Sequence, residues 1–219
     1  MVKTPEEYFQ AQAFDPPTDG KGEALTPAEQ AFVSKYMGIE GAKAVGIEAS
    51  VPADAAVVEA VLNAPRVPLH DELKSEAVIQ MVSFYLDSQV YTLPIAAVQE
   101  VIRYMPPTSL PLAPEYVAGV INLRGRVTPL LYLDQLITNT KRAHGEERFI
   151  IVCTRHGLQV GLIIDKVHTM YMVKQKQIIW NVESQIGANA EYLCGIVDIN
   201  DRIFGIVSID MMVDQVLKS

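Results

Sequence analysis

The pattern of apolar and polar positions changes near residue 75, and the two parts of the chain predict different structures. From residue 78 onward, short segments rich in Val, Ile, Leu and Tyr are separated by turn residues such as Asp87-Ser88 and Asn200-Asp201. Short strands spaced about 8–12 residues apart are typical of β-barrels and β-sandwiches. The expected strands are "VIQMVSFYL", "QVYTL", "VINL", "RVTPLLYL", "RFIIVCT", "LQVGLIID", "VHTMYMV", "YLCGIVDI" and "RIFGIVSI".

Two segments of this β-rich part resemble each other. "GVINLRGRVTPLLYL" and "GIVDINDRIFGIVSI" both contain a Gly, an apolar arm, a tip with Asn, an Arg and a second apolar arm. This likeness suggests two related halves of one β unit. Short helices are expected at 133–137 and 209–217, and long helices do not alternate with the strands, which argues against a parallel α/β sheet.

The first third of the chain is rich in Ala, Pro and Gly and predicts short helices instead of strands. In the clearest case Thr26 provides an N-cap, Pro27 occupies the first helical position and Gly38 ends the helix. Helices this short are marginal alone, so they must dock on the main domain, a second copy or a partner. The three expected helices span 5–13, 27–37 and 53–62.

Charge and composition narrow the function classes. The net charge is −8, and residues 1–75 hold 6 Lys/Arg against 12 Asp/Glu. This acidity argues against nucleic-acid binding and against electrostatic attachment to a membrane. With no signal peptide and no apolar run near the ~20 residues of a membrane span, we expect a cytoplasmic protein without membrane insertion. Cys153 and Cys194 lie in apolar strands and are expected to be buried and free.

Catalytic motifs are absent from the sequence. The four histidines have no metal-ligand spacing, and the chain contains no HExxH, CxxC, phosphate loop or GxSxG. We therefore expect no metal and no cofactor. An enzyme with an unrecognised site stays open as an alternative, with Asp165, Asp198 and His168 as candidates, although Asp at the end of a strand is more often a turn or cap residue.

One long segment resembles a known family. "FYLDSQVYTLPIAAVQEVIRYMPPTSLPLAPEYVAGVINLRGRVTPLLYLDQLI" is similar to the amino-terminal half of a CheW-like domain, and "GLIIDKVHTMYMV" and "YLCGIVDINDRIFGIVSID" continue it. The combination of "VQEV" with "GVINLRGRVTPL" is its specific part. The resemblance covers residues 76–217 and implies a mainly β fold of two packed five-stranded SH3-like β-barrel subdomains and a C-terminal helix. Residues 1–75 would form a partly helical extension and linker.

The resemblance also implies a function without enzymatic activity. CheW-like proteins are adaptors that link the cytoplasmic tip of a chemoreceptor to the CheW-like regulatory domain of a histidine kinase. The family's receptor-groove residues correspond to Arg124 and Glu100, with Val98 and Asn122 in the same elements, and an Arg–Glu pair would orient the guanidinium. From the residues alone, Arg124 could simply keep a hairpin tip soluble, Val98 could be core, and Arg126 is expected to be solvated.

Several features depart from the family pattern. Tyr132 and Ser208 stand where members usually have Asp. Serine can cap the helix that follows it and tyrosine cannot, so we expect the helix near 133–137 to begin later or to be shorter. Typical members lack residues 1–75. This extension could regulate the receptor groove or recruit another protein, and the fold could serve a signalling system other than motility.

Overall fold

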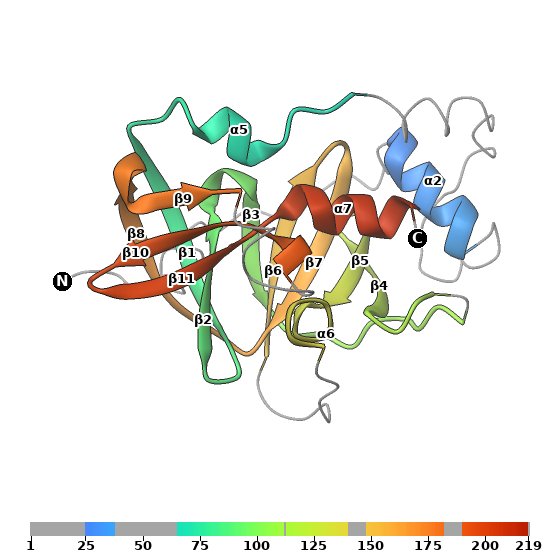
Figure 1. The fold of residues 1–219 in the computed structure, drawn as a ribbon. Coiled ribbons are helices and arrows are strands. Elements are labelled where there is room, and N and C mark those ends of the chain that lie inside the picture. Colours follow the sequence, from blue (N-terminus) through green and yellow to red (C-terminus); the bar gives the residue numbers. More distant parts are fainter. Residues whose placement is uncertain (1–24, 38–64, 112, 140–147, 182–189, 219) are drawn as a thin grey trace.

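The computed structural model describes residues 25–37, 65–111, 113–139, 148–181 and 190–218. Within these residues, eleven strands form two sheets, and a few short helices cover their ends and faces (Figure 1). The mainly β class expected from the sequence is confirmed. The helices expected at 5–13 and 53–62 lie outside the described residues.

The first sheet combines the beginning and the end of the β-rich part. It contains β1 (Val78–Leu86), β2 (Gln89–Pro94), β8 (Lys166–Lys174), β9 (Ile178–Trp180), β10 (Leu193–Ile199) and β11 (Arg202–Val207). Their order is β8-β1-β2-β11-β10-β9. Neighbouring strands are antiparallel except β2 and β11, which pair in parallel.

The second sheet is built from the chain between β2 and β8. It contains β3 (Val98–Arg103), β4 (Val117–Leu123), β5 (Arg126–Tyr132), β6 (Phe149–Arg155) and β7 (Leu158–Ile164). Their order is β3-β6-β7-β5-β4, so β3 and β4 are the edge strands. Here β5 and β7 form the parallel pair.

The two sheets share one arrangement, which confirms the related halves expected from the sequence. In each, the second strand of one antiparallel hairpin pairs in parallel with the second strand of another: β2 with β11, and β7 with β5. The similar segments form the β4–β5 and β10–β11 hairpins. At both tips, Arg124-Gly125 and Asn200-Asp201, the two central residues have positive φ, as type I′ turns require.

The observed strands differ from the expected ones in two places. All nine expected strands are present within three residues of their expected ends. Two further strands were missed: β3, whose "VQEVIR" has no clear alternation of apolar and polar residues, and β9, which has only 3 residues. Because β9 pairs with β10, the first sheet has six strands where five were expected.

The helices are short and lie at the ends and over the faces of the sheets. They are α2 (Pro27–Tyr36), α5 (Leu69–Leu73), α6 (Leu133–Thr138) and α7 (Ile209–Lys218), with 3-10 turns at Ile95–Ala97, Gln175–Gln177 and Ala190–Tyr192. None of the described helices is long and apolar enough to cross a membrane. Three of these helices, α2, α6 and α7, confirm the helices expected at 27–37, 133–137 and 209–217.

The two unusual cap positions behave differently. Ser208 Oγ accepts a hydrogen bond from the Met211 amide at 3.4 Å, as expected of a cap. Tyr132 makes no side-chain cap bond, yet α6 begins directly after it, so the expectation of a later start is wrong. Asp134 Oδ1 accepts the Gln135 amide at 3.0 Å instead, which satisfies one amide of the first turn.

A continuous apolar core joins both sheets to the helices. It contains fully buried side chains from α2 (Phe32), β1 (Met81), β6 (Ile151) and α7 (Val213). Cys153 is fully buried and Cys194 is nearly so, and both are free thiols, as expected. Burial raises the pKa of the Cys153 thiol, so this residue behaves as a small core side chain.

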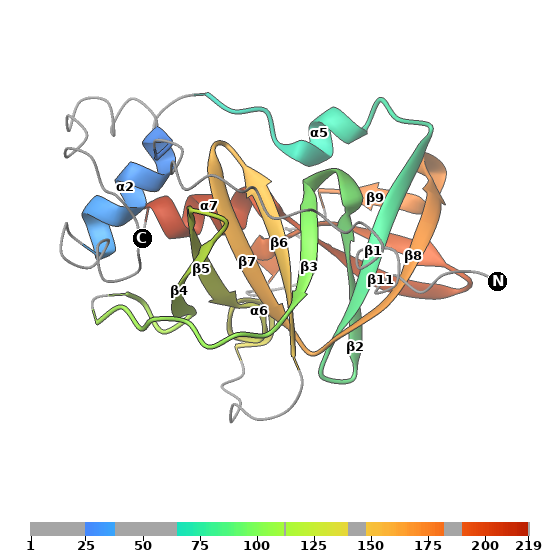
Figure 2. The same cartoon turned by 180° about the vertical axis from the view of Figure 1, so that it is seen from behind.

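The described part of the N-terminal extension packs on the main domain. In both ribbon views α2 lies beside α7 and α5 lies over the sheets (Figures 1 and 2). Lys35 Nζ donates to the Leu217 carbonyl at 3.1 Å, and the Tyr36 hydroxyl donates to the Val216 carbonyl at 3.2 Å. Of the three docking partners that the sequence left open, the structure shows the first for α2 and for residues 65–74.

Candidate partner-binding site

The tip of the β4–β5 hairpin is a two-residue turn with a specific local geometry. Leu123 pairs with Arg126, which leaves Arg124 and Gly125 as the loop, with φ of 56° and 81°. A Cβ at Gly125 would meet nothing within 4 Å, so glycine is favoured there by backbone conformation and not by space. Asn122 Oδ1 accepts the Gly125 amide at 2.9 Å and so fastens the turn from inside.

The structure brings Arg124 and Glu100 together. Arg124 Nη2 donates to Glu100 Oε2 at 2.9 Å, and the two side chains are 40% and 16% exposed. Since Arg124 extends from the end of β4 and Glu100 lies on β3, the ion pair links the two edge strands of the second sheet. An ion pair this exposed contributes roughly 0–1 kcal/mol to stability, so its main effect is to orient the guanidinium.

The other carboxylate oxygen of Glu100 is buried, and among the described residues no donor reaches it. The Glu100 carboxylate therefore keeps an acceptor site beside the Arg124 guanidinium. A buried acceptor without a hydrogen bond costs free energy, and that cost is relieved when a donor arrives. Because this oxygen is buried, only the half-exposed Arg124 guanidinium of the pair is open to a partner, which would bring an acceptor.

Val98 is half-buried and lies between the core and the predicted site. It lies on β3, where it pairs with Cys153, and a shift in register separates it from Glu100 on the same strand. Its half-buried side chain packs against the main core. Of the four predicted site residues, the structure therefore joins Arg124 to Glu100 and Asn122 to the turn, while Val98 is in part a core residue.

Arg126 is not the solvated residue that the sequence suggested, and that expectation is wrong. Its side chain is 28% exposed, and its Nε donates to Glu29 Oε1 of α2 at 2.9 Å. Glu29 is only 2% exposed. Sequence reasoning missed this contact because its two members are 97 positions apart, and Glu29 was assigned only to the first turn of its helix.

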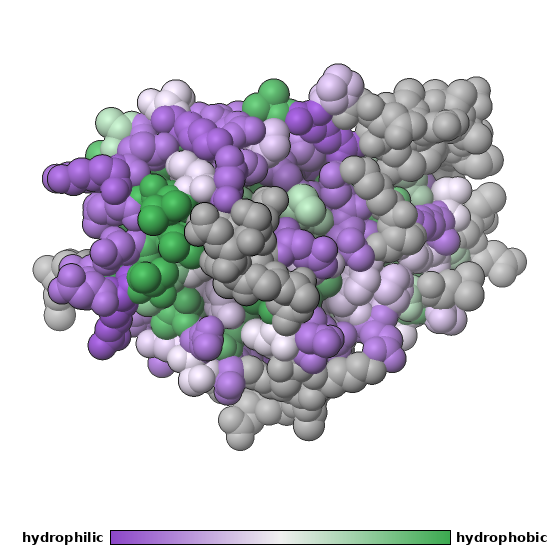
Figure 3. All heavy atoms as spheres, in the orientation of Figure 1, coloured by the Kyte–Doolittle hydropathy of each residue, from purple (hydrophilic) through white to green (hydrophobic). Residues whose placement is uncertain are grey.

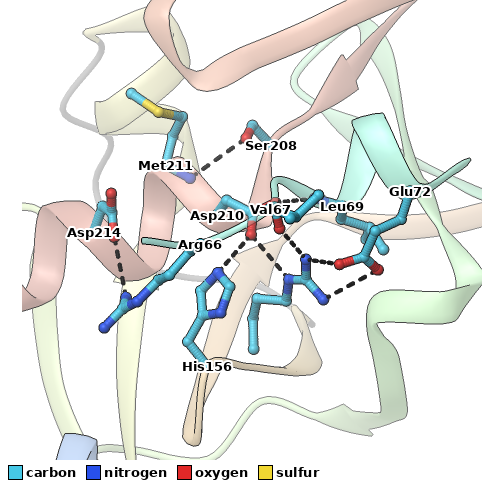
Figure 4. A network of polar contacts seen from close by, with 10 residues as sticks. Arg66, Val67, Leu69, Glu72, His156, Ser208, Asp210, Met211 and Asp214 are labelled. Atoms are coloured by element: carbon cyan, nitrogen blue, oxygen red, sulfur yellow. Dashed lines mark hydrogen bonds and ion pairs between the residues drawn. The ribbon is translucent and has the colours of Figure 1, made fainter. Parts of the chain in front are cut away.

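A second cluster of charges fastens the other described segment of the extension (Figure 4). Arg155, at the end of β6, donates from Nε to Asp210 Oδ1 at 2.9 Å and from Nη2 to Glu72 Oε1 and the Val67 carbonyl, both at 2.7 Å. Arg155 thereby joins β6, α7 and the segment around α5.

Asp210 is the acceptor at the centre of this cluster. Besides Arg155, its carboxylate lies 2.8 Å from His156 Nε2 and accepts the Leu69 amide at 2.8 Å. Burial alone would raise the pKa of Asp210, but the hydrogen bonds from Arg155 and Leu69 outweigh it and hold this pKa below its ordinary value. Apart from the turn at 155–157, no local sequence pattern predicts this cluster, because its members come from distant parts of the chain.

Comparison with known proteins identifies the family. The family model described as "CheW-like domain" matches residues 80–217. The chain belongs to this CheW-like family. Because the matched range begins within β1, α2 and α5 both lie outside the CheW-like match.

Relatives and a solved structure agree with this assignment. "Chemotaxis protein CheW" of Helicobacter pylori is 31% identical over 146 residues, which cover 66% of this chain and 84% of that protein. The protein of the same name from Thermotoga maritima is 26% identical over 149 residues, covering 68% and 94%. "Scaffolding protein TtCheW from Thermoanaerobacter tengcongensis" superposes with a TM-score of 0.55 at 28% identity, covering 60% of this chain and 89% of that one.

The residues considered for an enzymatic site have separate local contacts. Asp165 Oδ2 accepts the Asp87 amide at 2.6 Å, His168 packs edge-on against Tyr85 with ring centroids 5.0 Å apart, and Asp198 is an exposed residue of β10. The described surface has a shallow hollow that none of the three lines. Its lining consists of Glu115, Tyr116, Gln135, Leu136, Asn139, Glu191 and Tyr192.

Proposed function

We propose that this CheW-like chain is a non-enzymatic cytoplasmic adaptor that couples the cytoplasmic tip of a chemoreceptor to the CheW-like regulatory domain of a histidine kinase. Residues 76–217 would carry this activity, with residues 1–75 as an added extension. Membership of the family and the names of the relatives support the proposal. The single observation that carries the receptor contact is the Arg124–Glu100 pair.

The geometry of the pair suits the binding of a receptor helix. Arginine presents a planar set of donors, and Glu100 holds the Arg124 guanidinium while leaving 40% of the side chain exposed. A side chain ordered in advance loses less entropy on binding. Asn122 would contribute by fastening the turn, and the half-buried Val98 would add an apolar contact.

An adaptor also needs a second surface for its other partner. Figure 3 shows apolar surface over the six-stranded sheet, away from the β4–β5 hairpin. Met172, Ile179 and Ile203 of this sheet are 67%, 60% and 70% exposed. Exposed apolar side chains on one sheet favour a protein contact there, and we assign the kinase domain to this sheet as part of the proposal.

The receptor contact is tested by reversing the charge of Arg124. We would measure binding of the full chain to a purified chemoreceptor signalling fragment and, separately, to the kinase regulatory domain. Arg124→Glu places two carboxylates side by side, so we expect the receptor dissociation constant to rise at least about tenfold, or 1.4 kcal/mol, with kinase binding unchanged.

The matched control is Arg202→Glu. Arg202 is an exposed arginine directly after the tip of the β10–β11 hairpin, which is the counterpart hairpin of the first sheet. The same charge change there should leave receptor affinity within a factor of about two. If both variants weaken receptor binding equally, Arg124 is not the contact. If wild type binds neither fragment, the CheW-like fold serves another signalling system.

A further inference from the structure

The extension reaches the base of the hairpin that carries Arg124. Glu29 of α2 is almost completely buried, and both of its oxygens are used: Oε1 accepts Arg126 Nε at 2.9 Å and Oε2 accepts the Thr26 amide at 2.8 Å. A carboxylate buried to this degree is tolerated only when it is paired and hydrogen-bonded. Glu29 therefore needs Arg126 in this one position.

Arg126 is the first residue of β5 and directly follows the turn. It pairs across the hairpin with Leu123, so Leu123 and Arg126 bracket the tip residues Arg124 and Gly125. Its Nη2 also lies 3.5 Å from the Gly157 carbonyl, its hydrogen-bond acceptor. With both contacts made, the base of the tip is attached to α2 and to the β6–β7 turn.

The helix itself is fastened at the same place. Thr26 Oγ1 donates to the Gly157 carbonyl at 2.5 Å and accepts the Glu29 amide at 3.2 Å, which completes a capping box. The first turn of α2 is thus a rigid support whose position is set by the main domain. Each arginine of the hairpin then has its own carboxylate: Glu100 for Arg124 and Glu29 for Arg126.

We infer that α2 is a positioning element of the receptor contact, in which the Glu29–Arg126 ion pair holds the β4–β5 tip in the conformation that presents Arg124. Arg126 is then a positioning residue and not itself a receptor contact. Through this ion pair, a helix outside the CheW-like match would control how the domain presents Arg124. The inference rests on the proposed function of the hairpin, but its first test does not.

The first test is hydrogen exchange of the Gly125 amide in the full chain, measured by NMR without any partner. Glu29→Gln removes the charge but keeps the cap, because glutamine also serves at the third position of a capping box. We expect exchange at Gly125 to become about five times faster, since the tip would lose part of its ordered population. The control is Arg66→Gln, which breaks the extension's contact with Asp214 at 3.3 Å and leaves the hairpin's contacts intact.

The control separates positioning from general loosening of the extension. Arg66→Gln should leave exchange at Gly125 unchanged. Unchanged exchange in Glu29→Gln would overturn the inference, and so would equal acceleration in both variants. Neither result depends on whether the protein binds a receptor.

The second test is a double-mutant cycle on affinity for the receptor signalling fragment, using Glu29→Gln, Arg126→Gln and the double variant. If the tip is properly placed in about a fifth of molecules once the pair is broken, each single variant binds about fivefold more weakly. The double variant should be no weaker than either, because both changes break one pair.

An additive result, in which the double variant binds about 25-fold more weakly, would show Arg126 contacting the receptor directly and overturn the inference. Faster exchange at Gly125 in Glu29→Gln, together with no binding of the fragment by wild type, would refute the proposed function and leave the positioning role standing.

Discussion

Asp210→Asn should destabilise the protein in a manner that depends on pH. The substitution keeps the size of the side chain and removes its charge at the centre of the cluster that joins α7 to β6 and to the segment around α5 (Figure 4). Asp210 has a side chain that is 13% exposed and accepts hydrogen bonds from Arg155 and Leu69. Asparagine lacks the charge that strengthens these hydrogen bonds, and its amide group would lie beside the Arg155 guanidinium.

The structure sets the size of the effect. Removing one member of a buried pair costs about 3–5 kcal/mol when the other charge is stranded. Arg155 is not stranded, because Glu72 Oε1 remains 2.7 Å from its Nη2. A charged hydrogen bond contributes about 1.5–3 kcal/mol, and asparagine retains one acceptor oxygen. We therefore expect the free energy of unfolding at pH 7 to fall by about 2–3 kcal/mol.

The sign of the pH dependence follows from the lowered pKa of Asp210. In the unfolded chain an Asp titrates near pH ~3.9, and in the folded protein Asp210 titrates lower. Its stabilising contribution is complete above the unfolded pKa and is lost as the pH falls through the folded pKa. The difference between wild type and Asp210→Asn should therefore shrink on acidification.

Urea denaturation of both proteins at pH 7 and near pH 3 measures this difference. The two proteins differ only at position 210 and share the other charged groups of the cluster, Arg155 and Glu72 among them. Asp214→Asn is the control, since its 31% exposed side chain pairs with Arg66 at the surface and should change stability by less than about 0.5 kcal/mol. A difference that is absent at pH 7, or that persists undiminished near pH 3, would refute the reasoning.

Two further predictions concern buried side chains. Phe32 of α2 is 0% exposed, so Phe32→Ala should lower the free energy of docking of this helix by up to about 3–5 kcal/mol. The loss should be seen as faster hydrogen exchange of the amides in 27–36. The control Ser34→Ala changes an exposed residue of the same helix and should leave this exchange unchanged. Equal exchange in the two variants would show that α2 is not docked in solution. Cys153 and Cys194 should resist Ellman's reagent in the native protein and react in denaturant, because both are buried; rapid native labelling of either would contradict their placement.

Local chemistry explains which elements the sequence could predict. The strands were found because their apolar runs end at turn residues, and α2 was found because Thr26 and Pro27 mark its start. Short or irregular elements were missed: "VQEVIR" mixes polar and apolar residues without strict alternation, and β9 has only 3 residues, which pair with the edge of β10. When tertiary structure decides whether a strand pairs, a segment of 3–6 residues carries little sequence signal for that pairing.

The candidate site was predictable in part for the same reason. Arg124, Glu100 and Asn122 came from the resemblance to the CheW-like family, and the Arg124–Glu100 contact is present in the structure. Arg126 was assigned wrongly because no local rule connects it to Glu29. Long-range ion pairs follow from the docking of elements, and that docking was left open when only the sequence was known.

The repeated hairpin shows what the site requires beyond the fold. The β10–β11 tip has the same turn as the β4–β5 tip, with positive φ at Asn200 and Asp201, and it also places an arginine, Arg202, at the start of its second strand. Yet Arg202 is exposed, whereas Arg126 is paired with Glu29. Folding therefore needs two residues that accept positive φ, and it needs neither an arginine in the turn nor a paired arginine after it. Both features occur together at the β4–β5 tip, where the docked extension meets the hairpin, and this is why we propose that they serve partner binding and not folding.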